Sequence, residues 1–336
     1  MLKILIPILI SISISCCSSH QAPAVSTEDN VSLDVQNILW WFPEDTETVT
    51  VARGPFKAEA LDKNSWPIDL EKALCQISIA EFIYLNDSKF SKYVNGQTVL
   101  LSVEGSRKFR APTALGGMPY EGCSVICFDA AGFVSQTKLL LQSLQAAARQ
   151  TRNINGHRVF VFNEKREGDV WEIFLTFPRE SIVMCATNEK FLSEMFSRLD
   201  KVDGRRALPQ SLPEWESIDV QAPFWGIRHY AQSSYDQDPS SPLSGETRGF
   251  NIPDKQGIGL TYVYDPRRAN ELRIKYLSEN KDADRLADEY WNAPEGEDKP
   301  QVRKGTSGVD IVFVFQNNRD PLLALFLLRG ALGQGV

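Results

Sequence analysis

Residue types that could do chemistry are sparse in this chain. It contains three histidines, and only His157 and His229 lie beyond its N-terminal region. His229 stands beside Arg228 in an alternating segment, so these two residues are candidate binding residues; a hydrogen-bonded strand histidine is the alternative. His157 follows Gly156 at a predicted turn, where it is expected to cap the next strand. This pattern does not indicate a Ser-His-Asp or Cys-His catalytic group.

No motif of a familiar catalytic or cofactor-binding class occurs in the sequence. The chain has no Gly-x-Ser-x-Gly, His-Glu-x-x-His or Walker phosphate loop, and Gly257-Ile-Gly259 lacks the third glycine of a dinucleotide-binding loop. Neither a Cys-x-x-Cys pair nor a pair of histidines at ligand spacing is present. The sequence therefore predicts no cofactor and no metal site, and any catalytic residues stay unknown.

A pair of carboxylates is the catalytic arrangement that the composition leaves open. Glycosidases need two carboxyl groups about 5–10 Å apart, and 43 aspartates and glutamates are present. The nearest clusters are Glu44, Asp45 and Glu47, and Asp236 with Asp238, and both are predicted to be solvated turn residues. A glycosidase-like envelope hydrolase is therefore the alternative function.

Two further segments could bind ligands. The basic run from Arg107 to Arg110, followed by Gly116-Gly117, could hold an anion on backbone amides, and a solvated connection is the alternative. Trp40 and Trp41 precede the first predicted strand, where they form either a binding face or a hydrophobic plug at the core edge. Trp40 and Trp41 are therefore candidate binding residues as well.

The N-terminus has the pattern of an export signal. Lys3 supplies one positive charge, residues 4–14 are almost wholly apolar, and small residues lead into Cys16-Cys17. The apolar run is shorter than the ~20 residues of a transmembrane helix. The segment resembles a bacterial lipoprotein signal, which implies a lipid on Cys16 or on Cys17; cleavage after Ser15 and soluble secretion are the alternative.

A flexible tether, residues 17–38, is expected to follow a signal peptide of residues 1–16. Residues 18–32 are small and polar, with little to bury. The residue after the cysteines is Ser18, whereas an aspartate at this position would resemble a signal for retention in the inner membrane. We therefore expect a protein exported to the cell envelope, either anchored to the outer membrane on its periplasmic side or secreted.

The chain beyond the leader is longer than one ordinary domain, and its composition is globular. Hydrophobic residues make up 43% of the sequence, and 43 acidic against 36 basic residues give a net charge of −7. Because the charges of both signs are interspersed, no nucleic-acid partner is predicted. The expected partners are the membrane, through the N-terminal lipid, and an unknown protein or small-molecule ligand.

Four cysteines follow the leader: Cys75, Cys123, Cys127 and Cys185. Cys123 and Cys127 share a predicted strand and lie ~13 Å apart, which is too far for a disulfide. Either could pair with Cys185, and the alternative is that all four are buried free thiols.

Strands and helices are predicted from the period of the apolar residues. Helices are expected over residues 68–84, 134–150, 283–291 and 321–332, and another from Phe191 to Leu199 with Asn188 as its cap. The long polar stretch Ser233–Asp254 is predicted to be a solvated loop, and a functional loop is the alternative. Segments that alternate with period two predict strands at Thr48–Arg53, Thr98–Val103, Cys123–Phe128, Arg158–Asn163, Val170–Phe177, Ser181–Thr187, Phe224–Ala231, Ile258–Tyr264, Glu271–Leu277 and Val309–Phe315.

The order of these elements predicts an α+β fold of two related units, each a mainly antiparallel sheet packed against helices. Residues 39–205 form the first predicted unit and residues 206–336 the second. The boundary falls near Leu199–Pro213, where Asp-Gly-Arg-Arg and two prolines interrupt the pattern.

Two short segments carry a family resemblance. They are Trp41-Phe-Pro-Glu-Asp-Thr-Glu-Thr-Val-Thr-Val, before the first strand, and Ile182-Val-Met-Cys-Ala-Thr-Asn-Glu-Lys-Phe-Leu, which leads into a helix. They resemble an uncharacterised class of bacterial exported proteins and lipoproteins that open with Pro-Ala-Asp-Thr, although Glu44 replaces the alanine here. The resemblance implies repeated α+β units over residues 40–330 and no particular activity. The sequence thus favours a lipid-anchored envelope protein that acts as a non-enzymatic binding or interaction module.

Overall fold

The computed structural model describes residues 34–58, 91–108, 120–166, 169–199, 204–229, 259–264, 271–277, 301–305 and 308–314. Most of these residues belong to β-strands, and the helices are few. The elements in chain order are α1 Val35–Ile38, β1 Thr48–Lys57, α3 Ser91–Val94, β2 Thr98–Lys108, β3 Tyr120–Phe128, α4 Ala130–Ala147, β4 Gln150–Ile154, β5 His157–Arg166, β6 Asp169–Arg179, β7 Ile182–Ala186, α5 Glu189–Leu199, the 3₁₀-helix η1 Pro213–Ser217, β8 Phe224–His229, β9 Gly259–Tyr264, β10 Glu271–Leu277, β11 Gln301–Gly305 and β12 Gly308–Val314.

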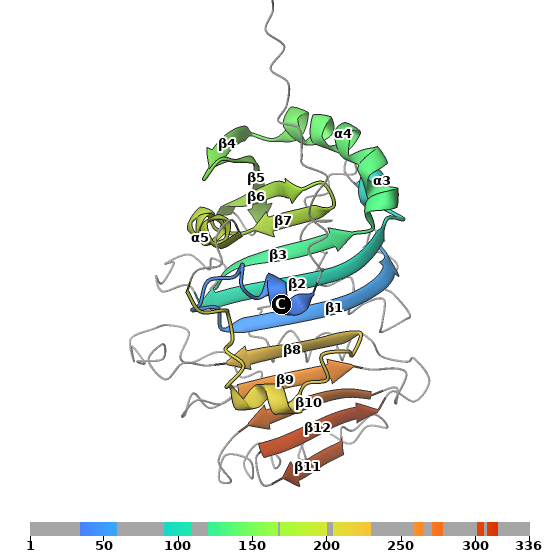
Figure 1. Cartoon of the computed structure of the whole chain (residues 1–336), viewed down its shortest axis with the longest axis vertical. Helices are drawn as coiled ribbons and strands as arrows, with labels where there is room; N and C mark the ends of the chain where they lie inside the picture. The colour runs from blue at the N-terminus through green and yellow to red at the C-terminus, as the bar shows by residue number, and fades with distance from the viewer. Residues whose placement is uncertain are drawn as a thin grey trace, which may run out of the picture. The chain divides into compact units, whose positions relative to one another are not determined.

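The described strands form one sheet of 12 strands in the order β11-β12-β10-β9-β8-β1-β2-β3-β7-β6-β5-β4 (Figure 1). Neighbouring strands pair antiparallel throughout, as between β1 and β2 and between β1 and β8. A sheet-dominated, antiparallel fold with a few helices is therefore confirmed. Because β1 pairs with β8, strands from both predicted units belong to the same sheet.

All ten predicted strands are present, and the structure adds β4 and β11. The sequence of β4, Gln-Thr-Arg-Asn-Ile, is polar on both registers, and only Ile154 of it is buried. A strand at the edge of a sheet pairs on one side only, so it needs no apolar alternation to be held there. The predicted helix through residue 150 was wrong at its end, because α4 stops at Ala147 and Arg149 donates to the Val161 carbonyl.

Alternating side chains on the strands build a hydrophobic core on each face of the sheet. On β3, Val125 belongs to the larger cluster and Phe128 to the smaller one. Helices α1 and α5 and the region around η1 pack with the larger cluster, and α3 and α4 pack with the smaller one. Strands β2, β3, β5, β6 and β7 are therefore covered on both faces, which explains why several of them are apolar on both registers.

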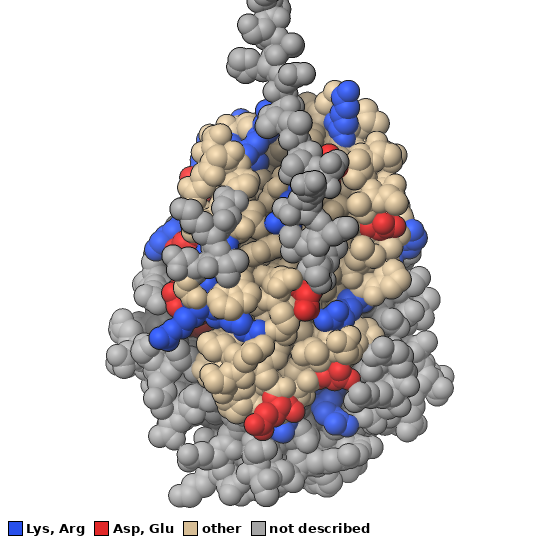
Figure 2. All heavy atoms as spheres, in the orientation of Figure 1, with Lys and Arg blue, Asp and Glu red and all other residues tan. Residues whose placement is uncertain are grey.

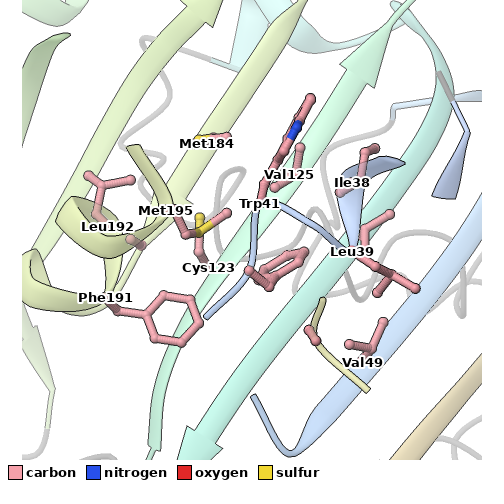
Figure 3. Close-up of a cluster of buried hydrophobic side chains, with 14 of the residues drawn as sticks. Ile38, Leu39, Trp41, Val49, Cys123, Val125, Met184, Phe191, Leu192 and Met195 are labelled. Atoms are coloured by element: carbon pink, nitrogen blue, oxygen red, sulfur yellow. The ribbon is translucent and has the colours of Figure 1, made fainter. Parts of the chain in front are cut away.

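The larger cluster joins segments that are far apart in the sequence. Figure 3 shows Phe191 and Met195 of α5 in one cluster with Cys123 of β3 and with Trp41, which comes from the segment before β1. Phe191 and Met195 are fully buried, and Trp41 is 6% exposed. Burying each such side chain stabilises the fold by ~1.5–3 kcal/mol before entropy is counted.

Polar caps begin the two longer helices. Asn188 accepts a hydrogen bond from the Phe191 amide at 3.1 Å, which confirms the predicted cap of α5. The apolar stripe of α5 is buried at Phe191, Leu192, Met195 and Phe196, as predicted. Asp129 caps α4 by accepting from the Ala131 amide at 3.3 Å.

The described cysteines are free and buried. Cys123 and Cys127 lie in the larger core cluster, whereas Cys185 lies in the cluster on the other face of the sheet. A side chain on one face of a strand cannot bridge to a side chain on the opposite face, so neither Cys123 nor Cys127 pairs with Cys185. Cys75 lies outside the described residues.

Several sequence predictions fall on residues that the structure does not describe. They are the lipidation of Cys16 or Cys17, residues 17–33 of the tether, the loop Ser233–Asp254, and the helices at 68–84, 283–291 and 321–332. The last residues of the predicted tether are described, and they form α1 with Val35 and Ile38 buried in the larger core cluster, so the tether was predicted to extend too far. Among the helices that are described, none has both the length and the apolar character needed to cross a membrane.

Candidate ligand-binding site

Arg107, near the end of β2, is the centre of the densest group of charged side chains in the described part of the chain. Its side chain is 10% exposed. Nη1 lies 2.8 Å from Asp45 and 2.8 Å from Glu194, and Nε lies 2.8 Å from Glu121. Nη2 lies 3.2 Å from the second oxygen of Glu194 and 2.7 Å from Glu121. One guanidinium therefore gathers three carboxylates.

Separate elements bring these carboxylates together. Glu121 stands opposite Arg107 in the register of β2 and β3, so the strand pairing alone places the two side chains side by side. Glu194 comes from α5, whose buried apolar stripe fixes the helix against the sheet. Asp45 precedes β1, and the Phe191 ring lies 5.1 Å from the guanidinium carbon of Arg107. The group is thus positioned by packed secondary structure.

The charge of Arg107 is stabilised by this arrangement. Burial lowers the pKa of the guanidinium, but hydrogen bonds to Glu194, Asp45 and Glu121 raise it by more, so the pKa stands above its ordinary value. Because each nitrogen of Arg107 already contacts a carboxylate oxygen, the residue has no N–H group left for an incoming anion. Arg107 therefore lies in β2 within a group of ion pairs, and not in a solvated connection. The other possibility, an anion held on backbone amides of the loop, falls mostly on residues 109–119, which the structure does not describe.

A hollow of about 510 Å³ opens beside Arg107. The segment before β1 contributes Glu44 and Asp45 to its wall, and β3 contributes Glu121. Helix α5 contributes Lys190 and Arg198, with Glu194 and Ser197 on the same helix. Charged groups of both signs also alternate across the described part of the face drawn in Figure 2, without a continuous patch of one sign. Glu44 and Asp45, which the sequence marked as solvated turn residues, thus line a hollow.

The candidate residue His229 has a partner that the sequence did not indicate. Its Nδ1 lies 2.6 Å from Oε1 of Glu214, a residue of η1 that is fully buried. The second oxygen, Oε2, of Glu214 is buried without a hydrogen-bond partner among the described residues. Arg228 does not join this pair, because consecutive strand residues point to opposite faces of the sheet. Nothing in the sequence around Pro213–Ser217 marks Glu214, which lies beside a predicted unit boundary.

The two candidate tryptophans are placed differently. Trp41 is in the larger core cluster with Arg179 over its ring at 5.7 Å, which is the packing role that the sequence left open beside binding. Trp40 is half-buried, and its carbonyl accepts from Nε of Arg198 at 3.0 Å. The Trp40 backbone therefore borders the hollow through one of its lining residues.

A metal site and a second acidic pair, Asp236 with Asp238, complete the sites that the sequence brought into question. Within the described ranges, no three His, Cys, Asp or Glu side chains are grouped so that they could hold a metal ion. Asp236 and Asp238 are outside those ranges.

Comparisons of the chain with protein-family models, with curated proteins and with solved structures find no match. The hollow and the buried His229–Glu214 pair therefore have to be interpreted from their own geometry.

Proposed function

We propose that this protein is an exported, lipid-anchored binding module of the cell envelope without enzymatic activity, and that the hollow beside Arg107 holds its ligand. The observation that carries the proposal is the hollow itself, which is about 510 Å³ in volume and lined by charged side chains. Polar groups held on a rigid scaffold can orient a ligand without rearranging. The proposed location in the cell envelope is inferred from the N-terminal sequence, in which Cys16 or Cys17 is the lipidated residue.

A glycosidase-like hydrolase is the rival for the same hollow. Such an enzyme needs one carboxylic acid that can protonate a glycosidic oxygen and a second carboxylate that faces the sugar. Glu121 and Glu194, which both line the hollow, are each bound to Arg107. Carboxylates that are ion-paired with one guanidinium are held in place and in their charged form, which favours recognition of a ligand over transfer of a proton. Binding is therefore the favoured function.

The finer fold prediction, two related units, is part of the same proposal. Counted outward from the β1–β8 pair, β2 and β3 follow on one side, and β9 and β10 follow on the other. In each direction the next strand, β7 or β12, comes from a later part of the chain. Supported by this matching order, we propose that residues 39–205 and 206–336 are diverged copies of one unit.

A retention experiment with charge-reversed variants tests the binding function. The mature chain, immobilised through a C-terminal tag, is exposed to envelope extracts, and retained components are identified by mass spectrometry. Glu44→Lys changes the hollow at an exposed residue, and Lys138→Glu is the control, since it is exposed on α4 over the other face of the sheet. Components lost with Glu44→Lys and kept with Lys138→Glu support the proposal. Equal retention by all three proteins contradicts it.

The proposed lipid anchor is tested separately. Mass spectrometry of the mature N-terminus is expected to find a diacylglyceryl group on Cys16 or Cys17, and an unmodified N-terminus would rule out the anchor.

A further inference from the structure

Apart from the hollow, we infer that Arg206 forms a second binding site and that this site takes a carboxylate group. The carboxylate is supplied by an acidic peptide or by a free small acid. Arg206 lies in the segment between α5 and η1 and is not among the residues that line the hollow. The inference follows from the missing counter-ion of a buried guanidinium and from the hydrogen-bond donors that remain around it.

Arg206 is a buried arginine that contacts no carboxylate of the described residues. It is 6% exposed. Burial lowers the pKa of its guanidinium, and no described carboxylate acts in the opposite direction. Arg107, the other buried arginine in the described part of the chain, contacts three carboxylates. Because a buried charge in a folded protein is normally paired, the missing counter-ion indicates a site for an anion.

Neutral groups hold this guanidinium in place. Nε and Nη2 donate to the Leu208 carbonyl at 3.2 and 3.0 Å, and Nη1 donates to Oε1 of Gln36 on α1. The Trp215 ring of η1 lies 4.9 Å from the guanidinium carbon. Leu208 has a φ of 48°, which is uncommon for a residue with a side chain, so the surrounding contacts fix this turn. The orientation of Arg206 is therefore set before a ligand binds.

Hydrogen-bond donors exceed acceptors around Arg206. An arginine carries five N–H groups, and the contacts above leave one N–H on Nη1 and one on Nη2 without a described acceptor. The Leu208 carbonyl also accepts from Nε1 of Trp215 at 3.2 Å, so its two lone pairs are already used. A ligand that complements this site must accept hydrogen bonds and carry a negative charge.

The number of remaining donors favours a carboxylate over a phosphate. A carboxylate has one negative charge and two oxygens, which match the single charge and the two N–H groups of Arg206. A phosphate group carries about 1.5 to 2 negative charges and three acceptor oxygens, so part of it would stay unpaired here. Because Arg206 is 6% exposed, only a small end group can reach it. The side chain of an aspartate or glutamate in a peptide, or a small free acid, has such an end group.

Nuclear magnetic resonance titration of the mature chain tests the inference with four probes. Acetate represents a free acid, a capped Ala-Glu-Ala peptide represents an acidic peptide, capped Ala-Gln-Ala lacks the charge, and sulfate is an anion of different shape. We expect saturable shifts of the Trp215 indole N–H signal with a carboxylate and none with the neutral peptide. Arg206→Lys keeps the charge but loses the planar fork, so it should weaken binding about tenfold. Arg205→Gln, at the adjacent exposed residue, is the control and should leave binding unchanged.

The outcomes distinguish the two sources of the carboxylate and a purely structural arginine. Binding of acetate identifies a free acid as sufficient, and binding of the acidic peptide alone identifies a peptide partner; either result supports the inference. Equal shifts with the neutral peptide, tighter binding of sulfate than of either carboxylate, or no shift with any probe would overturn it. Arg206→Gln should abolish binding, and where this variant does not fold, Arg206→Lys decides. Unchanged affinity in the folded variant contradicts the site.

Discussion

At the scale of single residues, Arg107 is expected to contribute to stability as well as to the hollow. Replacing it with Met leaves Asp45, Glu121 and Glu194 without their shared cation. Because Glu121 is 15% exposed and the other two are more accessible, the loss should be about 2 kcal/mol, below that of a fully buried pair. Urea unfolding measures it. Arg149→Met is the matched control, because Arg149 is 61% exposed and should cost under ~0.5 kcal/mol. Equal effects of the two substitutions would contradict this role.

The buried carboxylate of Glu214 makes His229 a second stability-determining residue. His229→Ala removes the partner of a fully buried carboxylate, so the free energy of unfolding should fall by about 3 kcal/mol. Adding Glu214→Gln should restore part of that loss, because a neutral amide costs less to bury than a charge. Chemical unfolding of the single and double variants checks this. A double variant that is less stable than His229→Ala would refute the explanation.

Residue-scale features were only partly predictable from the sequence. His229 could be selected because histidines are rare, but Glu214 lies in a short 3₁₀-helix with no pattern that links it to β8. Arg107 was predicted to lie in a basic loop, because the local sequence shows a basic run and does not show the carboxylates that pack around it. Glu194 is an ordinary exposed helix position by sequence, and only the docking of α5 on the sheet brings it to Arg107.

At the scale of elements, close contact between β2 and the segment before β1 explains a glycine. A Cβ atom on Gly105 would lie 2.5 Å from the Phe42 ring, which is itself fully buried. Gly105→Ala should therefore destabilise the protein by ~1–3 kcal/mol through overpacking. Gly132→Ala on α4 is the control, since its nearest atom would be a side-chain oxygen at 3.4 Å and alanine favours the helix. Thermal unfolding compares them, and a neutral Gly105→Ala would contradict the contact.

Burial of Cys127 on β3 determines how this thiol responds to pH. Burial raises the pKa of Cys127 from 9.0 to about 12, although Arg179 acts in the opposite direction. The unfolded state therefore releases this proton first, and stability should fall by ~1.4 kcal/mol per pH unit between about pH 9 and 12. Cys127→Ala lacks this contribution. The difference in unfolding free energy between the parent and Cys127→Ala, measured at pH 7 and pH 10, should shrink at the higher pH, and a constant difference would exclude the effect.

Elements were the most predictable scale. Segments such as Glu271–Leu277 alternate so clearly that the sequence gives β10 with the correct bounds. Strand β4 was not predicted, because its side chains are polar on both registers. What holds an edge strand in place is its pairing with the neighbouring strand, here β5, and this pairing leaves no pattern in the local sequence. The end of α4 was predicted too late for the same reason. The backbone of Arg149 pairs with β5, and this pairing ends the helix although the residues there could have continued it.

At the scale of the whole molecule, the larger core cluster joins both predicted units. Trp41 of the first unit and Trp225 of the second belong to that cluster, and β1 and β8 are hydrogen-bonded neighbours. The order of the sheet could not be predicted, because pairing of β1 with β8 is a contact between distant segments and leaves no local period. If residues 39–205 and 206–336 arose by duplication, the two copies now share the larger core cluster at their interface.

That shared core predicts cooperative unfolding of the described sheet. Trp41 and Trp225 are 6% and 0% exposed, so the fluorescence of each should report the loss of its surroundings. Two variants, each retaining one of these tryptophans with the others replaced by Phe, are expected to unfold in urea with coincident midpoints, because neither unit can keep its side of the cluster once the other is lost. Two midpoints separated by more than the error of the fits would show that the predicted units unfold independently. Residues 39–205 expressed alone provide the complementary measurement: without β8 the edge of β1 and the apolar surface over Val49 and Val51 are exposed, and this fragment should aggregate or remain loosely packed.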